Sequence, residues 1–546
     1  MKVIILFPPG WSFNVGSPHL GIPLITGMLK KHGISVKARD LNWEIAKYYG
    51  VNIGIEEIKR SVKIGTLESL NEPYFQAEDT LMDIARRYDG VWNLQLGFKF
   101  NRFSFNSSKD VLNAMKMKSP FTWFYKEKII PWIDQEKPTV LGFGLASIYQ
   151  LIPTFHLCWL LKQNQFKGTI VLGGNTVSRL KDEFIKVPKV FDYMDVLVIF
   201  QGEIPFLKLC QNIMENKRLD DIPNIVWKDQ DLIKSNPLTC KQDPNYIPTP
   251  DFKDFPIGKY WGINYYPLVS TRGCYYNKCT FCSIPYGYGG FGGMRRAELI
   301  FQDMCKLSKR CDVILFKFMD EAMPPNIMKK LAELIIQHRS PFEWESFARL
   351  EKCWQNANFM DCLANGGFKK AYFGLEIYSD TSRISLNKKD EARHISEILK
   401  KCHEYGIKVG LFCMFGFPGT DRDDAERTID FILEYKDLID TVDINEYTYA
   451  KHTYVPNIQK VEKGKDWCLE YEYYGKTIGI LSSREVEELV SEMERILWDE
   501  CPRLLHPTYR LISPWDKYKE HIYDVEKLMA INKQNISEED FISIVT

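Results

Sequence analysis

Short apolar segments that run into glycine-bearing loops recur along this 546-residue chain, with helix-like segments between them. The pattern begins at Val3–Phe7, continues through a segment with helical apolar spacing at Ile22–Lys31, and reaches Ser35–Asp40. It resumes in three further strand-like segments, at Val140–Ser147, Thr169–Asn175 and Val196–Glu203. This alternation predicts a doubly wound parallel α/β sheet, which binds ligands at the carboxyl ends of its strands.

A second series of apolar strand candidates follows a proline-rich stretch, and helical segments again separate its members. The candidates are Leu268–Thr271, Val313–Met319, Phe342–Ala348, Lys370–Leu375, Lys408–Met414 and Thr441–Tyr447. Six parallel strands connected by helices predict a partial (β/α)6 barrel.

The two series predict an α/β chain with an ordered set of domains. We expect a Rossmann-like domain over 1–218 that contains a mostly helical insertion at 46–138. A linker follows at 219–262, with a short hairpin near Ile225–Ile233. The barrel then occupies 263–455, and a mostly helical region occupies 456–546. In the last region, Ser482 and Glu485 form a capping box ahead of an amphipathic helix.

Charge and hydropathy exclude several classes of protein. Lys plus Arg and Asp plus Glu both total 71, and no tract of like charge indicates a nucleic-acid or membrane surface. No run of 18 apolar residues occurs, and the apolar run after Met1 is too short for a signal peptide. Most of the 14 cysteines are scattered singly, as buried thiols are in a reducing compartment. We expect a cytoplasmic protein whose substrate is a small molecule or a peptide.

Three cysteines form the one dense group in the chain: Cys274, Cys279 and Cys282 follow a short strand and precede a glycine-rich loop. Three thiolates on a loop can ligate three irons of a [4Fe–4S] cluster and leave the fourth iron open to another ligand. A zinc site or a coincidence of buried thiols are the alternatives. No histidine lies between His156 and His338, which disfavours local zinc.

The segments Ser270–Cys274 and Lys278–Cys282 resemble the cluster signature of the radical S-adenosylmethionine (SAM) superfamily, specifically its cobalamin-binding branch. The resemblance implies a [4Fe–4S] cluster on the three cysteines, with SAM and cobalamin as further cofactors. The chain departs from the family pattern at one point, because four residues separate Cys274 from Cys279 where the family has three.

The resemblance also implies a set of SAM-binding residues near the carboxyl ends of the barrel strands. Arg349 resembles the family's arginine, Gly374–Glu376 resembles its Gly-Ile-Glu-Ser segment with Ile377 in place of serine, and Phe415–Gly419 resembles its Gly-Phe-Pro-Gly loop. The Gly-Gly-Glu of other branches is absent. The implied residues are Phe281, Asp320, Glu321, Glu345, Arg349, Glu376 and Gly416. Taken singly, each could instead be a surface carboxylate, a structural ion pair or a simple turn.

The first domain resembles the family's cobalamin-binding fold. The implied cobalamin-binding residues are Pro9, His19, Gly21, Ser147, Gly173, Gly174, Asn175, Gly202 and Glu203. Glycines at strand ends permit the close approach of a flat macrocycle and its nucleotide tail. The Asp-x-His-x-x-Gly motif, whose histidine ligates cobalt, is absent, as is common in this branch. A domain that kept the fold and lost the cofactor stays an alternative.

By resemblance, the chain uses one SAM to methylate cobalamin and a second to generate the 5′-deoxyadenosyl radical, so that a methyl group reaches an unactivated carbon of a natural product or peptide. An electron donor such as flavodoxin or ferredoxin is implied. The insertion at 46–138 and the chain after residue 465 are the expected substrate determinants. Alternatives are a radical rearrangement, cyclisation or ring contraction, peptide epimerisation or thioether formation with an empty cobalamin fold, and a cofactor-binding sensor.

Overall fold

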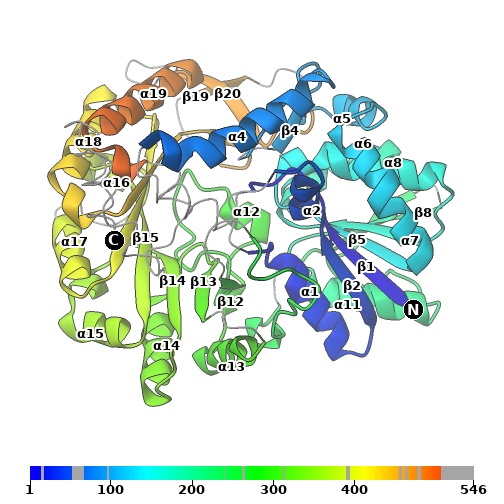
Figure 1. Ribbon diagram of the computed structural model, residues 1–546, viewed down its shortest axis with the longest axis horizontal. Coiled ribbons are helices and arrows are strands. Elements are labelled where there is room, and N and C mark those ends of the chain that lie inside the picture. The colour runs from blue at the N-terminus through cyan, green and yellow to red at the C-terminus, as the bar shows by residue number, and fades with distance from the viewer. Residues whose placement is uncertain are drawn as a thin grey trace.

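The computed structural model describes residues 1–13, 17–51, 67–94, 97–230, 232–239, 242–260, 265–310, 314–388, 394–453, 458–461, 465–475 and 481–505. Two parallel sheets, each with helices around it, lie side by side (Figure 1). The first sheet is on the right of the figure and the second on the left, with the short helix α12 (Ile284–Tyr288) between them. Among the described residues, no helix is both long and apolar enough to cross a membrane.

The first sheet has seven strands in the order β2-β1-β5-β6-β7-β8-β9. Its first five strands pair in parallel, as the sequence predicted. Their bounds are β1 Lys2–Phe7, β2 Ser35–Asp40, β5 Val140–Gly144, β6 Thr169–Gly173 and β7 Val196–Val198.

Alternate side chains of β1 enter two separate cores. Val3, Ile5 and Phe7 pack on the face covered by helices α1 and α11, while Ile4 and Leu6 pack on the face covered by α2 and α8. A strand buried on both faces is the mark of a doubly wound sheet. The helices that accompany this sheet are α1 Gly21–Lys31, α2 Leu41–Tyr48, α8 Leu151–Gln163, α9 Asn175–Arg179, α10 Lys181–Ile185 and α11 Glu203–Met214.

The second sheet has six strands, all parallel, in the order β10-β13-β14-β15-β16-β17. Its edge strands β10 and β17 do not pair with each other, so the barrel is partial, as predicted. The strands are β10 Tyr266–Leu268, β13 Leu315–Phe318, β14 Glu343–Ala348, β15 Phe368–Glu376, β16 Lys408–Phe415 and β17 Thr441–Glu446. The helices are α13 Ala297–Ser308, α14 Pro325–Gln337, α15 Ala357–Asn365, α16 Asp380–Ser385, α17 Ile395–Glu404 and α18 Arg422–Glu434.

The hairpin expected in the linker belongs to the first sheet. Strands β8 (Ile225–Asp229) and β9 (Leu232–Ser235) extend that sheet, because β8 pairs antiparallel with β7. The pairing satisfies backbone groups that β7 would otherwise leave open at the sheet edge. The extended linker is therefore shorter than the sequence indicated.

The insertion between β2 and β5 contains strands as well as helices. Its elements include the hairpin of β3 (Gly90–Asn93) and β4 (Gly97–Phe100). Its helices are α4 Leu67–Arg86, α5 Ser108–Ala114, α6 Pro120–Phe124 and α7 Ile130–Glu136, with a π-helical turn at Tyr125–Ile129 between the last two.

The chain after the barrel is also less helical than expected. A small antiparallel sheet, ordered β18-β20-β19, precedes the predicted amphipathic helix α19 (Ser483–Glu500), and Ser482 and Glu485 form its capping box. The strands are β18 Tyr449–Ala450, β19 Ile458–Val461 and β20 Glu470–Gly475. This region returns to the first domain, since Trp467 N donates to Asn106 O at 2.8 Å. The prediction for 506–546 lies outside the described residues.

Candidate cofactor sites between the two domains

The three cysteines lie on the loop that links β11 (Thr271–Arg272) to α12, just beyond the carboxyl end of β10. Asp320, at the end of β13, holds the start of this loop. Its carboxylate accepts hydrogen bonds from Ser270 N at 3.0 Å, from Thr271 N at 2.5 Å and from Thr271 Oγ1 at 2.6 Å. The predicted SAM ligand Asp320 therefore positions the cysteine loop.

The segment between Cys274 and Cys279, which is one residue longer than in the family, contains a left-handed backbone at Asn277, whose φ is 54°. Asparagine adopts this region more readily than most residues. Two tyrosines then anchor the loop to the barrel. Tyr275 donates to Glu351 Oε1 at 2.9 Å, and Tyr276 donates to the Asn387 carbonyl.

Arg349 completes this clamp on the loop. Its guanidinium lies 3.6 Å from the centre of the Tyr276 ring and donates to Lys388 O at 2.7 Å and Glu351 Oε1 at 3.1 Å. The predicted SAM ligand Arg349 thus lies directly against the cysteine loop and belongs to a cluster of charged groups around it.

The three cysteines are half-buried and lie close enough for their charges to interact. Burial raises the pKa of Cys282 to about 12 and also raises the pKa of Cys279, which the charges of Lys388 and Arg349 oppose. Three thiolates on one loop can each ligate a separate iron of a [4Fe–4S] cluster.

Glu376 and Glu321 are two further predicted SAM ligands at the carboxyl end of the barrel. Glu376 has a φ of 60° and accepts a hydrogen bond from Lys388 Nζ at 2.5 Å. Glu321 accepts a hydrogen bond from Tyr288 and interacts electrostatically with Cys282. Desolvation by the surrounding protein atoms raises the pKa of Glu321, although the residue is exposed at the surface. With Arg349, these groups place both signs of charge beside the cysteines.

Glu345 lies inside β14 rather than at its end, because that strand runs from Glu343 to Ala348. Its buried carboxylate is paired with Lys317 at 3.0 Å and accepts a hydrogen bond from Tyr372 at 3.0 Å. Both carboxylate oxygens are therefore engaged in the barrel interior, away from the strand end where the sequence placed them.

Phe281 lies on the cysteine loop and Gly416 directly follows β16, and both positions are closely packed. The Phe281 ring lies 5.1 Å from the ring of Phe417. Gly416 has a φ of 87°, and a Cβ there would collide with Val486 of α19. The glycine is thus required by the packing of a helix that lies outside the barrel.

A cavity of about 210 Å³ opens at the carboxyl end of the first sheet. Seven of the nine predicted cobalamin residues line it: His19, Gly21, Gly173, Gly174, Asn175, Gly202 and Glu203. Pro9 and Ser147 are not among its lining residues. Ser147 Oγ instead caps a turn by accepting a hydrogen bond from Tyr149 N at 3.3 Å.

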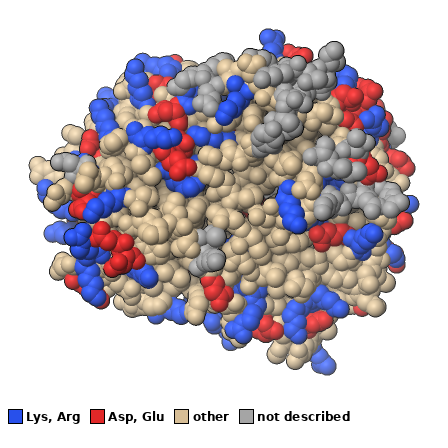
Figure 2. Space-filling view, turned by 180° about the vertical axis from the view of Figure 1, so that it is seen from behind, with Lys and Arg blue, Asp and Glu red and all other residues tan. Residues whose placement is uncertain are grey.

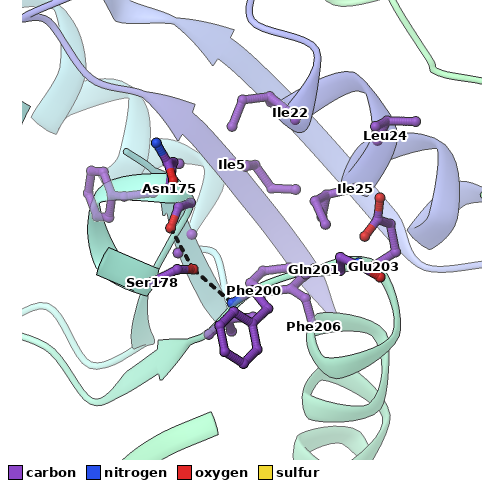
Figure 3. A pocket seen from close by; sticks show the side chains of 18 of the residues that line it. Ile5, Ile22, Leu24, Ile25, Asn175, Ser178, Phe200, Gln201, Glu203 and Phe206 are labelled. Carbon is purple, nitrogen blue, oxygen red and sulfur yellow. Dashed lines mark hydrogen bonds between the residues drawn. The ribbon is translucent and has the colours of Figure 1, made fainter. Parts of the chain in front are cut away.

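Apolar side chains such as Ile5, Ile22 and Ile25 line the cavity (Figure 3), and many of its other lining residues are glycines. Side chains of β1, β6, β7, α1 and α11 form the inner walls: Ile5, Val171, Val198, Ile22, Leu24, Ile25 and Phe206. Glycines allow a ligand to reach the backbone because they carry no Cβ. The arrangement suits an apolar group in the slot and a flat group across the mouth.

The sequence reasoning missed several lining residues. Ser178, Phe200 and Gln201 follow strand ends that the sequence located, so their position beside predicted residues was a usable signal. Arg272, Gly287 and Tyr288 come from the cysteine loop and α12, and nothing in the sequence indicated that they face this cavity.

His19 is half-buried, and desolvation lowers its pKa to about 4, so the imidazole is uncharged at neutral pH. Its ring stacks on Phe7 with 4.9 Å between centroids, and Nδ1 accepts a hydrogen bond from Gly21 N at 3.3 Å. These contacts orient the imidazole at the wall of the cavity.

The cavity and the cysteine loop share a boundary. Arg272, two residues before Cys274, forms an ion pair with Glu203 at the start of α11. Tyr288 lines the cavity and hydrogen-bonds Glu321 of the barrel. Arg272 and helix α12 stand at the two ends of the cysteine loop, and both contribute lining residues to the cavity, so a ligand in the cavity would be a near neighbour of a ligand on the loop.

Comparisons with known proteins agree with this geometry. Residues 268–432 match the radical SAM superfamily. The chain is 23% identical over 354 residues to an uncharacterized methyltransferase of Pyrococcus horikoshii, an alignment that covers 63% of this chain and 74% of that protein.

Two solved structures share the fold at low sequence identity. One is the radical SAM methyltransferase TsrM from Kitasatospora setae, with cobalamin and a [4Fe–4S] cluster bound, at a TM-score of 0.57 and 13% identity, covering 100% of this chain and 97% of TsrM. The other is the cobalamin-dependent radical SAM enzyme OxsB with aquacobalamin and SAM bound, at a TM-score of 0.54 and 13% identity, covering 98% of this chain and 62% of OxsB. Residues 268–432 therefore match the radical SAM superfamily, and the chain shares the overall fold of TsrM and OxsB.

Proposed function

We propose that this chain is a cobalamin-dependent radical SAM methyltransferase that transfers a methyl group to an unactivated carbon of a small molecule or peptide. The observation that carries the proposal is the meeting of two sites across α12: a three-cysteine loop at the carboxyl end of the barrel and a glycine-mouthed cavity at the carboxyl end of the first sheet.

Cys274, Cys279 and Cys282 would hold a [4Fe–4S] cluster. When bound, such a cluster with one open iron supplies the electron that cleaves SAM reductively and so starts hydrogen abstraction from the substrate. The protein fixes the loop through Asp320 and through the clamp of Tyr276 and Arg349.

SAM carries a carboxylate, an amino group and a sulfonium, and the strand ends beside the cysteines offer matching charges. Arg349 is suited to the carboxylate, since a guanidinium binds carboxylates through several donors. Glu376 and Glu321 are suited to the cationic groups. Glu345 interacts with Lys317 and Tyr372, and Asp320 holds the cysteine loop, so we propose that both support the site through these contacts.

The cavity of the first domain fits the two parts of cobalamin. The apolar slot between the sheet and helices α1 and α11 is suited to the aromatic base of the nucleotide tail, and the glycine-lined mouth to the macrocycle. The mouth also faces Arg272, Gly287 and Tyr288, so the exposed face of a corrin there would look toward the cysteine loop.

Substrate and partner assignments belong to the same proposal. The insertion at 46–138 and the segment from residue 465 contact each other, because Ser108 N donates to Asp466 Oδ1 at 2.8 Å. We propose that the two segments shape the substrate site together. We propose a small protein electron donor, such as flavodoxin or ferredoxin, and a cytoplasmic location.

Anaerobic reconstitution tests the proposal. The protein should bind iron, sulfide and hydroxocobalamin by metal analysis and absorbance, and should cleave SAM to 5′-deoxyadenosine under reducing conditions. Cys282→Ala should lose the cluster absorbance, whereas Cys305→Ala, a partly buried thiol in α13, should keep it.

Product stoichiometry then identifies the reaction. Methyl transfer forms S-adenosylhomocysteine and 5′-deoxyadenosine together, whereas a rearrangement forms 5′-deoxyadenosine without S-adenosylhomocysteine. A protein that binds neither iron–sulfide nor corrin would contradict the proposal.

A further inference from the structure

The short helix α12 takes part in both candidate cofactor sites. It begins two residues after Cys282, and its residues Gly287 and Tyr288 line the cavity of the first domain. A Cβ at Gly287 would lie 3.1 Å from Asn175 Oδ1, so the helix packs closely on that cavity wall. A helix of five residues has little stability of its own, because its few hydrogen bonds do not offset the cost of nucleation. Contacts with the rest of the protein therefore decide where α12 lies.

Tyr286 of α12 is enclosed between two side chains from different parts of the chain. Lys181 Nζ, from α10 of the first domain, lies 3.2 Å from the centre of the tyrosine ring. The imidazole of His452, two residues after β18, stacks on the same ring with 3.5 Å between centroids and 16° between planes. Two groups this close to one ring centre lie on opposite faces, because they would overlap on the same face. A cation–π interaction and a stacking interaction therefore hold one side chain from both sides.

A hydrogen bond and an ion pair strengthen this enclosure. The Tyr286 hydroxyl donates to Asp182 Oδ2 at 2.5 Å, and Lys451, which adjoins the stacked histidine, forms an ion pair with Glu183. Charged side chains of both signs are spread over the face of the protein shown in Figure 2, whereas Lys181 and Glu183 are buried, at 7% and 4% exposed. A buried charge is costly unless it has a partner, and the tyrosine ring and Lys451 supply those partners. The first domain and the chain after the barrel therefore hold α12 together.

We infer that Tyr286 is a positioning residue for both cofactors, because the contacts that fix its ring also fix α12 and so pre-organise the cysteine loop and the cavity together. This inference rests on the proposed binding of a cluster and a corrin. With the ring enclosed, neither ligand has to order α12. Without it, the ligand that binds first orders α12 and the second then binds at a lower entropic cost, which is positive cooperativity.

Equilibrium dialysis of the full-length protein against hydroxocobalamin, with cobalt measured by metal analysis, tests the inference. Each protein is measured twice, in its cluster-free form and after anaerobic reconstitution with iron and sulfide. In the cluster-free form, Tyr286→Ala should bind hydroxocobalamin about tenfold more weakly than wild type, the scale of the lost aromatic contacts. The cluster should recover most of this loss in Tyr286→Ala and should change the wild-type affinity less. A residue that only stabilised the fold would not produce that difference.

Two milder variants divide the contacts of the ring. Tyr286→Phe keeps the ring between Lys181 and His452 and loses only the hydrogen bond to Asp182, so cluster-free Tyr286→Phe should bind nearly as wild type does. Lys181→Met keeps a long unbranched stem and loses the charge, so it should weaken binding by less than Tyr286→Ala. In the Tyr286→Ala background it should have no further effect, because the lysine acts through the ring.

Tyr405→Ala is the matched control. Tyr405 directly follows α17 on the barrel and is also half-buried, and Lys401 Nζ lies 5.9 Å from the centre of its ring. The residue belongs to neither candidate cofactor site. Tyr405→Ala should bind hydroxocobalamin as wild type does, both without and with the cluster.

Four results would overturn the inference while leaving the proposed function intact. They are wild-type affinity in cluster-free Tyr286→Ala, an equal loss in that variant with and without the cluster, a Tyr286→Phe protein as impaired as Tyr286→Ala, and an equal loss from Lys181→Met in both backgrounds. If the wild-type protein itself fails to bind hydroxocobalamin in either form, the proposed function and this inference fall together.

Discussion

Arg272 and Glu203 form an ion pair between the two domains, and each residue belongs to a different candidate cofactor site. Arg272 precedes the first cysteine by two residues, and Glu203 begins α11 beside the mouth of the cavity. Their side chains are 13% and 7% exposed, so the pair is largely shielded from water. The geometry of the cysteine loop is thereby tied to the wall of the cavity.

Removing one partner of this pair should destabilise the protein. Arg272→Met leaves the Glu203 charge without its partner in a mostly buried place, at a cost of about 3 kcal/mol. The free energy of unfolding in urea measures the loss. The double variant Arg272→Met/Glu203→Gln should recover part of it, since no buried charge then lacks a partner. Equal stability of the two variants would contradict this account.

Asp320 should matter for the cluster because it holds the start of the cysteine loop. Asp320→Asn replaces a carboxylate that accepts three hydrogen bonds with an amide that has one acceptor oxygen, so Thr271 and Ser270 lose part of their anchor. We expect fewer irons per chain after reconstitution. Glu345→Gln, in the barrel interior, is the control for iron content. An Asp320→Asn protein with a full complement of iron would show that the loop needs no such anchor.

The backbone at Asn277 should decide whether the longer cysteine spacing works. Asn277→Gly keeps access to a φ of 54° and should reconstitute normally. Asn277→Val places a β-branched residue in the left-handed region, which costs about 1–2 kcal/mol. It should lower the cluster absorbance by disturbing the loop. Equal absorbance in the two variants would show that the loop has another conformation available.

Gly416 should be intolerant of any side chain. In Gly416→Ala the new methyl group collides with Val486 of α19 and the φ of 87° becomes strained, so the midpoint of thermal unfolding should fall. Adding Val486→Ala should restore part of the loss by making room, and the remainder should reflect the backbone. No recovery in the double variant would remove the steric part of the explanation.

Acid should destabilise the protein through His156. This histidine is buried, with Nδ1 2.6 Å from Met115 O and Nε2 3.0 Å from Thr122 Oγ1, and burial lowers its pKa from 6.5 to about 4. Between pH 6.5 and 4, the unfolded chain therefore binds a proton at this histidine that the folded chain does not bind. The contribution of His156 to the free energy of unfolding is complete above pH 6.5 and is lost as the pH falls toward 4. The loss approaches about 1.4 kcal/mol per pH unit.

A variant at this position separates the effect of His156 on stability from the effects of other titrating groups. The buried carboxyl of Asp40, whose pKa is raised to about 6, acts in the opposite direction over part of this range. His19, whose pKa is also lowered, acts in the same direction as His156. Unfolding free energies of wild type and His156→Gln from pH 4 to 7 should therefore be compared by difference, and identical slopes would contradict the assignment.

Much of the fold could be predicted because apolar periodicity and glycine-bearing strand ends are local signals. Each strand candidate of the two series overlaps a strand; the second sheet is parallel throughout, and the first is parallel over its first five strands. The hairpin at β8 and β9 was assigned to a linker because its membership of the first sheet depends on pairing with β7, an interaction that no local pattern reports.

The candidate site divides in the same way. The sequence by itself identified the three cysteines as candidate cluster ligands and identified most of the strand-end residues that line the cavity. This was possible because metal-ligand spacing and turn residues lie within short segments. Only the tertiary structure decided what each polar group does. Asp320 binds the cysteine loop, Glu345 pairs with Lys317, and Glu203 meets Arg272 across 69 positions of the chain. Each of these interactions joins residues that are far apart in the sequence, so it forms only when the packed fold brings their segments together.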